Sequence, residues 1–104
     1  LERHYSPHTP LKLVATSDLE AAIAEATLAG EQVAVLATHA ASTTRALVTW
    51  MDAGSNSTLY ARNLYRNIRA LDKVGASIIL VEAVPSDEAW AAVRDRLRRA
   101  ATPA

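Results

Sequence analysis

The stretch SIILVEA, residues 77–83, decides the fold. It is apolar at consecutive positions, as is QVAVLA at 32–37, so both faces of each strand must be covered. Strands of this kind are typical of parallel sheets that lie between layers of helices. Two more strands are expected at 11–14 (LKLV) and at 46–51 (ALVTWM), the second nearer an edge because Thr49 interrupts its apolar run.

Helical patterns separate these strands. SDLE at 17–20 has the form of a capping box, in which two side chains satisfy free backbone N–H groups, and Gly30 closes this first helix. A long second helix is expected at about 56–73, and a third follows Pro85. The order β-α-β-β-α-β-α predicts an α/β architecture with a mostly parallel sheet of about four strands and three helices. The strand order and the direction of strand 46–51 stay open.

Composition excludes several classes of protein. The 104 residues, 50% of them hydrophobic, describe one globular domain, and no apolar run reaches the roughly 18 residues of a membrane span. Without cysteine there is no disulfide, thiol nucleophile or thiolate metal site, which fits a reducing cytoplasm. Eleven basic residues balance eleven acidic ones, which argues against a strong nonspecific nucleic-acid binder.

Polar side chains gather where the predicted strands end. Because α/β sheets bind ligands beyond the carboxyl ends of their strands, the loop after strand 32–37 is a candidate ligand loop. Its candidate residues are Thr38, His39, Ser42 and Thr43, with Asp52 and Glu82 at the ends of the next two strands. The alternative is a plain polar loop, because the glycines of dinucleotide-binding and P-loop motifs are absent from the sequence.

No catalytic or metal site is predicted from the residues alone. Ser42, His39 and Asp52 form a triad on paper, but nothing around Ser42 resembles a nucleophile elbow. The three histidines, at positions 4, 8 and 39, do not have the local spacing of metal ligands.

A row of cations follows the long predicted helix. Tyr60, Leu64, Ile68 and Leu71 share its apolar face, and the opposite face carries Arg62, Arg66, Arg69 and Lys73. This basic stripe has two interpretations: a contact for an anion or a tRNA backbone, or the solvated side of an amphipathic helix.

Three stretches together resemble a known family. They are LERHYSPHTPLKLV at 1–14, LYARNLYRNIRALDKVGASIILVEAVP at 59–85 and WAAVRDRLRRAA at 90–101. They are similar to the C-terminal domain of the long, two-domain form of threonylcarbamoyl-AMP synthase, whose N-terminal catalytic domain is of the YrdC type.

The resemblance implies a division of labour. Residues 1–10 are then an interdomain linker arm and residues 11–104 a Rossmann-like three-layer domain, while the catalytic domain lies outside this chain. The whole enzyme, a nucleotidyltransferase of the cytoplasm, uses ATP with Mg²⁺, L-threonine and bicarbonate, and its product feeds the threonylcarbamoyladenosine modification of tRNA. The chain begins at Leu1 and its only methionine is Met51, so we expect a piece of a longer protein.

The resemblance also implies a role for the arm. In this family a His-Tyr-x-Pro motif folds over the active site, and here His4, Tyr5 and Pro7 occupy it. A proline-stiffened segment loses little entropy on docking, which suits a lid, whereas the alternative is a simple spacer. The domain is then noncatalytic, without a cofactor of its own, and its partner is the catalytic domain of the same chain. A free-standing small-molecule-binding domain and a tRNA or protein interaction module remain alternatives, and dimerisation stays open.

Overall fold

The computed structural model describes residues 6–102. Its four strands form one parallel sheet in the order β1-β4-β2-β3, namely β1 (Leu11–Val14), β2 (Val33–Ala37), β3 (Val48–Asp52) and β4 (Ile78–Glu82). Three α-helices follow the predicted order: α1 (Leu19–Leu28), α2 (Ser57–Asp72) and α3 (Ala91–Ala100). The predicted α/β fold is therefore confirmed, and the strand whose direction was open is a parallel edge strand.

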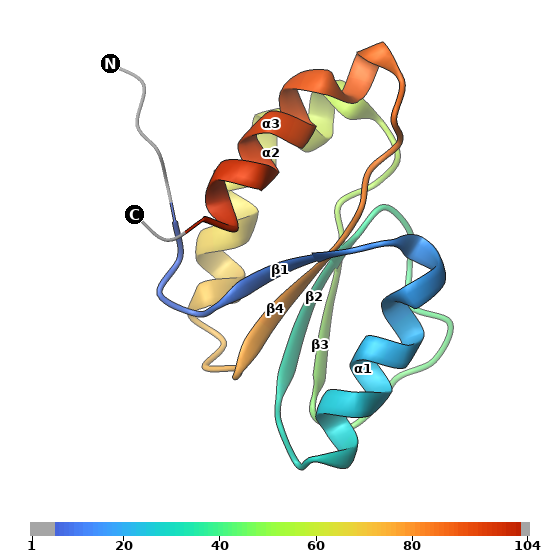
Figure 1. Cartoon of the computed structure of the whole chain (residues 1–104), viewed down its shortest axis with the longest axis vertical. Coiled ribbons are helices and arrows are strands. Elements are labelled where there is room, and N and C mark those ends of the chain that lie inside the picture. Colours follow the sequence, from blue (N-terminus) through green and yellow to red (C-terminus); the bar gives the residue numbers. More distant parts are fainter. Residues whose placement is uncertain (1–5, 103–104) are drawn as a thin grey trace.

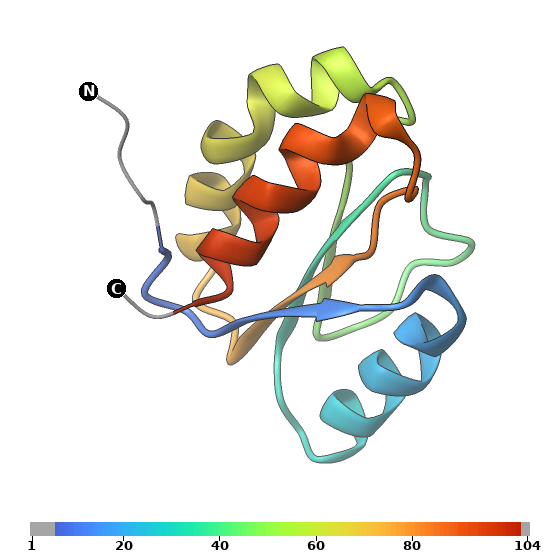
Figure 2. The ribbon, with the colours of Figure 1, turned by 45° about the horizontal axis from the view of Figure 1, so that its top comes forward.

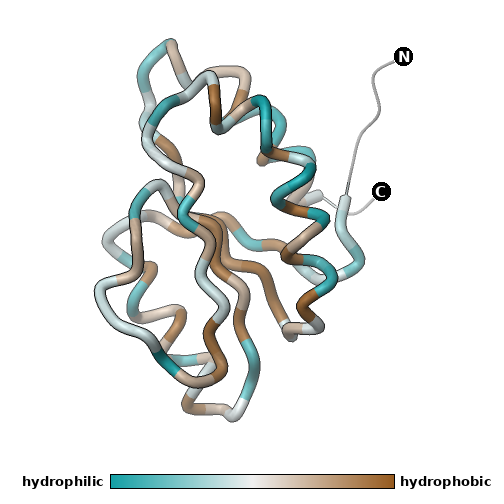
Figure 3. Tube along the Cα trace, turned by 180° about the vertical axis from the view of Figure 1, so that it is seen from behind, coloured by the Kyte–Doolittle hydropathy of each residue, from teal (hydrophilic) through white to brown (hydrophobic). Residues whose placement is uncertain are grey.

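The helices form two layers on either side of the sheet. Helix α1 covers one face alone, and α2 and α3 lie side by side over the other (Figures 1 and 2). The side chains on the α1 face are Val14, Leu19, Ile23, Val33, Val35, Ala37 and Leu80. The larger cluster under α2 and α3 centres on Leu36, Tyr60, Leu64, Ile68, Ile79, Val81, Trp90, Val93 and Leu97. Figure 3 shows the hydrophobic colouring running through the strands between these layers.

Position in the sheet explains the burial of each strand. All five residues of β2 are buried, because β2 lies between two strands and between two helical layers. Edge strand β3 has no buried residue, and its side chains are half-buried or exposed. The connection from β2 to β3 contains no helix, so nothing equivalent to α1 covers that end of the sheet.

The helix ends follow the sequence at α2 but not at α1. Asn56 caps α2, since its side-chain Oδ1 accepts a hydrogen bond from the Leu59 N–H at 3.0 Å. The capping box predicted at 17–20 is wrong: the chain enters α1 through a 3-10 turn (Thr16–Asp18), and the N-cap Asp18 makes no side-chain capping bond. The turn satisfies the Asp18 N–H through the Ala15 carbonyl at 2.9 Å instead. Gly30 takes a positive φ of 81° after α1, as predicted.

A second short turn (Glu88–Trp90) leads into α3 in the same manner. None of the helices within residues 6–102 has the length and apolar character that crossing a membrane requires.

Candidate functional site

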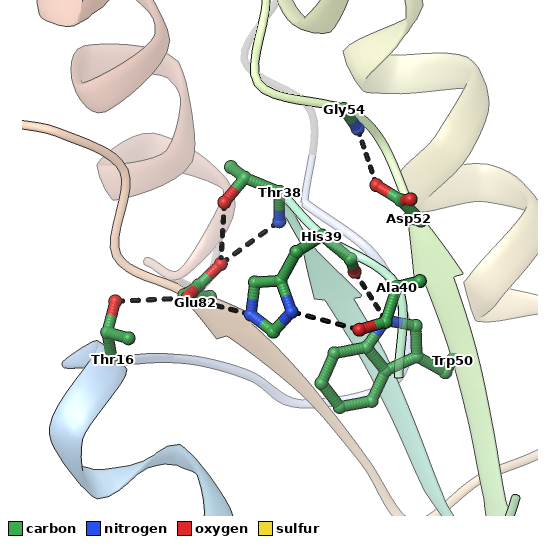
Figure 4. Close-up of polar contacts among 8 residues, drawn as sticks. All are labelled: Thr16, Thr38, His39, Ala40, Trp50, Asp52, Gly54 and Glu82. Atoms are coloured by element: carbon green, nitrogen blue, oxygen red, sulfur yellow. Dashed lines mark hydrogen bonds and ion pairs between the residues drawn. The ribbon is translucent and has the colours of Figure 1, made fainter. Parts of the chain in front are cut away.

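The Glu82 carboxylate is the centre of a polar network at the carboxyl edge of the sheet. It lies at the end of β4 and is only 3% exposed. The backbone N–H and the hydroxyl of Thr38 both donate to its Oε1 at 3.0 Å. The Thr16 hydroxyl donates to Oε2 at 3.0 Å, and Nε2 of His39 lies 3.3 Å from the same atom (Figure 4). One carboxylate thus joins the start of the first helical segment to the loop after β2.

The network favours an ionised carboxylate beside a protonated imidazole. Burial opposes the ionisation of Glu82, but the hydrogen bonds from Thr38 and Thr16 and the charge of His39 outweigh it and lower its pKa. The Ala40 carbonyl, 3.0 Å from Nδ1, and then Glu82 raise the pKa of His39. Because both ring nitrogens face acceptors, the doubly protonated ring satisfies both contacts.

Strand β3 also contacts the loop after β2. The Trp50 indole N–H donates to the His39 carbonyl at 2.8 Å, and the two rings lie 5.5 Å apart. Asp52, at the end of β3, accepts a hydrogen bond from the Gly54 N–H at 2.8 Å. The loop after β2 is therefore fixed at its first residues by both neighbouring strands.

A second carboxylate, Asp72 at the end of α2, binds the arm near the amino ends of β1 and β4, at the other end of the strands from Glu82. Its Oδ1 accepts hydrogen bonds from the Thr9 N–H at 2.8 Å and the Thr9 hydroxyl at 2.7 Å, and its Oδ2 accepts one from the His8 N–H at 3.0 Å. The Ser6 hydroxyl lies 3.4 Å from the Ala100 carbonyl oxygen at the end of α3. Residues 6–10, predicted as linker, thus lie against the domain.

The contacts with the arm favour the ionised form of the Asp72 carboxylate. Its partial burial opposes ionisation, but the hydrogen bonds from Thr9 and His8 outweigh that effect and lower its pKa. A hollow of about 540 Å³ lies beside the contact and includes Arg69 and Lys73 in its lining. Of the predicted lid residues, Pro7 is half-buried at this edge, and His4 and Tyr5 lie outside the described residues.

The four cations of the basic stripe are exposed on α2, opposite the buried face, as the helical spacing predicts. Arg66 donates to the Asn63 side chain at 2.7 Å, and Arg69 and Lys73 line the hollow near the arm. Both interpretations of the basic stripe stay predictions.

A family model described as "Threonylcarbamoyl-AMP synthase, C-terminal domain" matches residues 1–102. This chain belongs to that family. The predicted resemblance is therefore confirmed over nearly the whole sequence.

Solved structures agree with this assignment to the threonylcarbamoyl-AMP synthase C-terminal domain. The chain is similar to P. abyssi Sua5, crystallised with L-threonine, at 29% identity and a TM-score of 0.75 over 96% of this chain. It spans only 30% of the length of that protein. The C-terminal Sua5 domain of a hypothetical Sua5 protein from Pyrococcus horikoshii matches 89% of this chain, which covers 93% of that domain, at 21% identity and a TM-score of 0.70, and shows the same fold. No match was found among curated proteins.

The sequence located part of the polar network of this threonylcarbamoyl-AMP synthase domain. It placed Thr38, His39 and Glu82 at one edge, but their polar atoms bind one another rather than remaining free for a ligand. Ser42 and Thr43 are exposed and lie outside the network. Since the His39 nitrogens face Ala40 and Glu82, His39 is not placed to activate Ser42.

Two functional features were missed. The contact of Asp72 with the arm could not be predicted, because the two segments are 63 residues apart and no local motif links them. The ion pair of Arg45 with Glu20, at 3.0 Å, was missed for the same reason. Within residues 6–102, no group of three His, Asp or Glu side chains is arranged to hold a metal ion.

Proposed function

We propose that this domain is the noncatalytic C-terminal part of a threonylcarbamoyl-AMP synthase and that it anchors a lid. The whole enzyme would combine ATP, L-threonine and bicarbonate in an N-terminal catalytic domain, with Mg²⁺ accompanying ATP. Its product would serve tRNA modification in the cytoplasm. His4, Tyr5 and Pro7 would close over that catalytic domain.

The anchoring of the arm carries this proposal. Asp72 collects three hydrogen bonds from two adjacent arm residues, and Ser6 reaches the end of α3. A lid that starts from a fixed point searches fewer orientations, and so it loses less conformational entropy when it closes. The domain thus contributes to catalysis by position, without supplying a reacting group.

The carboxyl edge supports a noncatalytic role. Glu82 is buried and already accepts several hydrogen bonds, so it is not available to take a proton from a substrate. The solved relative that was crystallised with L-threonine is more than three times as long as the part this chain matches. This difference in length supports placing the substrate site in the part of the enzyme outside this chain.

The test compares two carboxylates in the full-length enzyme. Asp72→Ala removes the arm contacts, whereas the control Asp95→Ala removes a carboxylate on α3 that pairs with the surface groups Arg98 and Arg99. We expect Asp72→Ala to lower kcat of pyrophosphate release about tenfold, which corresponds to about 1.4 kcal/mol in the barrier. Asp72→Asn, which keeps one acceptor oxygen, should recover part of the loss.

Two results would contradict the proposal. One is an Asp72→Ala enzyme with the kcat of the control. The other is turnover of ATP, threonine and bicarbonate by the 104-residue chain alone, since the chain would then hold its own catalytic site.

A further inference from the structure

A hollow lies between the β2–β3 loop and edge strand β3. Its volume is about 390 Å³, and the strand residues in its wall are Val48, Trp50 and Asp52. The connection from β2 to β3 contains no helix, and its residues Ala40, Ala41, Thr43, Thr44 and Arg45 form the loop side of the hollow. Trp50 and Asp52 follow one another along β3 in Figure 4, and the first residues of the loop stand beside Trp50.

Strand β3 turns unused backbone groups toward its outer edge. Its bonds to β2 begin with the Val33 N–H donating to the Leu47 carbonyl and end with the Ala53 N–H donating to the Ala37 carbonyl. In a parallel ladder, alternate residues bond to the same neighbour, so β2 takes the groups of residues 47, 49, 51 and 53. The N–H and C=O of Trp50 therefore point outward, on the side where no strand follows β3.

Opposite charges stand at the two ends of this hollow. Arg45 lies just before β3 and lines the hollow, with its Nη2 paired to Glu20 at 3.0 Å, and its buried Nε–H has no hydrogen-bond partner within residues 6–102. Asp52 lies at the other end, where the Gly54 N–H donates to its Oδ1 and its charge also acts on His39. Strand geometry separates the Cα atoms of Val48 and Asp52 by about 13 Å, close to the length of three or four extended residues.

We propose that the hollow binds a short peptide with free termini, lying antiparallel to β3. Its backbone would pair with the outward N–H and C=O of Trp50, its carboxylate would face Arg45 and its ammonium group would face Asp52. The exposed hydroxyls of Thr43 and Thr44 line the loop side of the hollow, where they can bond the remaining peptide groups. A peptide added to a sheet edge gains affinity from its main chain, and the two charges set its length and direction.

The existing ion pair of Arg45 with Glu20 leaves Arg45 able to bind the carboxylate of a peptide. The Glu20 carboxylate is 63% exposed, and an exposed ion pair contributes little, so the guanidinium can accept a second carboxylate. A single amino acid carries both charges but is too short to reach both ends of the hollow. This site lies along edge strand β3, whereas the arm leads into β1 at the other side of the sheet, so the site is independent of the proposed lid.

The test is calorimetric titration of the 104-residue chain with trialanine in four forms: free, acetylated, amidated and blocked at both ends. We expect free trialanine to bind most tightly, each single block to weaken binding about tenfold, and alanine alone to give no saturation. Fluorescence of Trp50 should change on binding, and Trp50→Phe should remove that signal while the buried Trp90 is kept.

Matched variants assign each terminus to its residue. Arg45→Gln should abolish the preference for the free carboxylate and leave the preference for the free amine, whereas Asp52→Asn should do the reverse. Glu20→Gln removes the competing carboxylate and should tighten binding. Thermal unfolding of each variant confirms that it is folded. No saturable binding to the folded wild-type chain, or equal binding of free and doubly blocked trialanine, would overturn the proposal.

Discussion

One carboxylate makes the main polar contacts at each end of the strands, Glu82 at the carboxyl end and Asp72 at the amino end, but the two differ in burial. Glu82 is nearly inaccessible and joins three segments of the domain, whereas Asp72 is half-buried and binds His8 and Thr9 of the arm. A buried charge without its partners is costly, and a partly exposed one is not, because water replaces the lost hydrogen bonds. We therefore assign Glu82 to the stability of the fold and Asp72 to the position of the arm.

The largest effect is expected for Glu82→Ala. The substitution leaves the Thr38 N–H and the neighbouring hydroxyls without their acceptor, and it should lower the free energy of unfolding by about 3 kcal/mol. Urea denaturation measures this difference. Glu25→Ala, at an exposed position of α1, is the control and should change it by less than about 0.5 kcal/mol. Similar losses of unfolding free energy in Glu82→Ala and Glu25→Ala would contradict the assignment of Glu82 to the stability of the fold.

A smaller and local effect is expected for Asp72→Ala in the isolated chain. Loss of the carboxylate should reduce the free energy of unfolding by about 1 kcal/mol and speed hydrogen exchange at the His8 and Thr9 amides, with the sheet amides unchanged. Because the pKa of Asp72 is lowered below 3.8, its contribution is present above that value and is lost as the pH falls through the lowered pKa. Unchanged exchange at His8 and Thr9 would show that the arm is held by other contacts.

A weaker pH effect is expected from His39. Its pKa is raised above 6.5, so its contribution to stability is full below that pH and is lost as the pH rises through the raised value. Since His39 is 53% exposed, the difference in unfolding free energy between pH 5.5 and pH 8.5 should stay below about 1 kcal/mol. His39→Gln should remove that difference, and NMR titration of the ring reports its pKa directly. A ring pKa below 6.5 would contradict the proposed ion pair with Glu82.

The smallest effect is expected for Arg66→Glu on the basic stripe. Its neighbour in the structure is the uncharged Asn63, so charge reversal should alter the unfolding free energy by no more than about 0.5 kcal/mol. As a solvated face, the stripe should also give no measurable tRNA binding. Binding that weakens steeply with salt, and less steeply in Arg66→Glu, would instead identify the stripe as an RNA contact.

The sequence predicted what depends on local pattern. The apolar runs of β2 and β4, the spacing of Tyr60, Leu64 and Ile68, and the bounds of the long helix follow from short stretches, and the structure confirms them. The capping box failed because the chain enters α1 through a 3-10 turn, in which the Asp18 and Leu19 N–H groups bond to the Ala15 and Thr16 carbonyls. The candidate loop was placed at the correct edge, but the roles of Glu82 and Asp72 depend on partners 43 to 66 residues away, which periodicity does not reveal.

The strand order has a consequence for synthesis. Strand β4 is the last to be made, yet it lies between β1 and β2, and β1 has no other neighbour in the sheet. During synthesis, β1 therefore has no strand partner until β4, in the final third of these 104 residues, has been made. Such distant pairing slows folding and makes it cooperative. A fragment that ended between β3 and α2 would keep the β2–β3 pair, but its β1 would have no partner until a second fragment supplied β4.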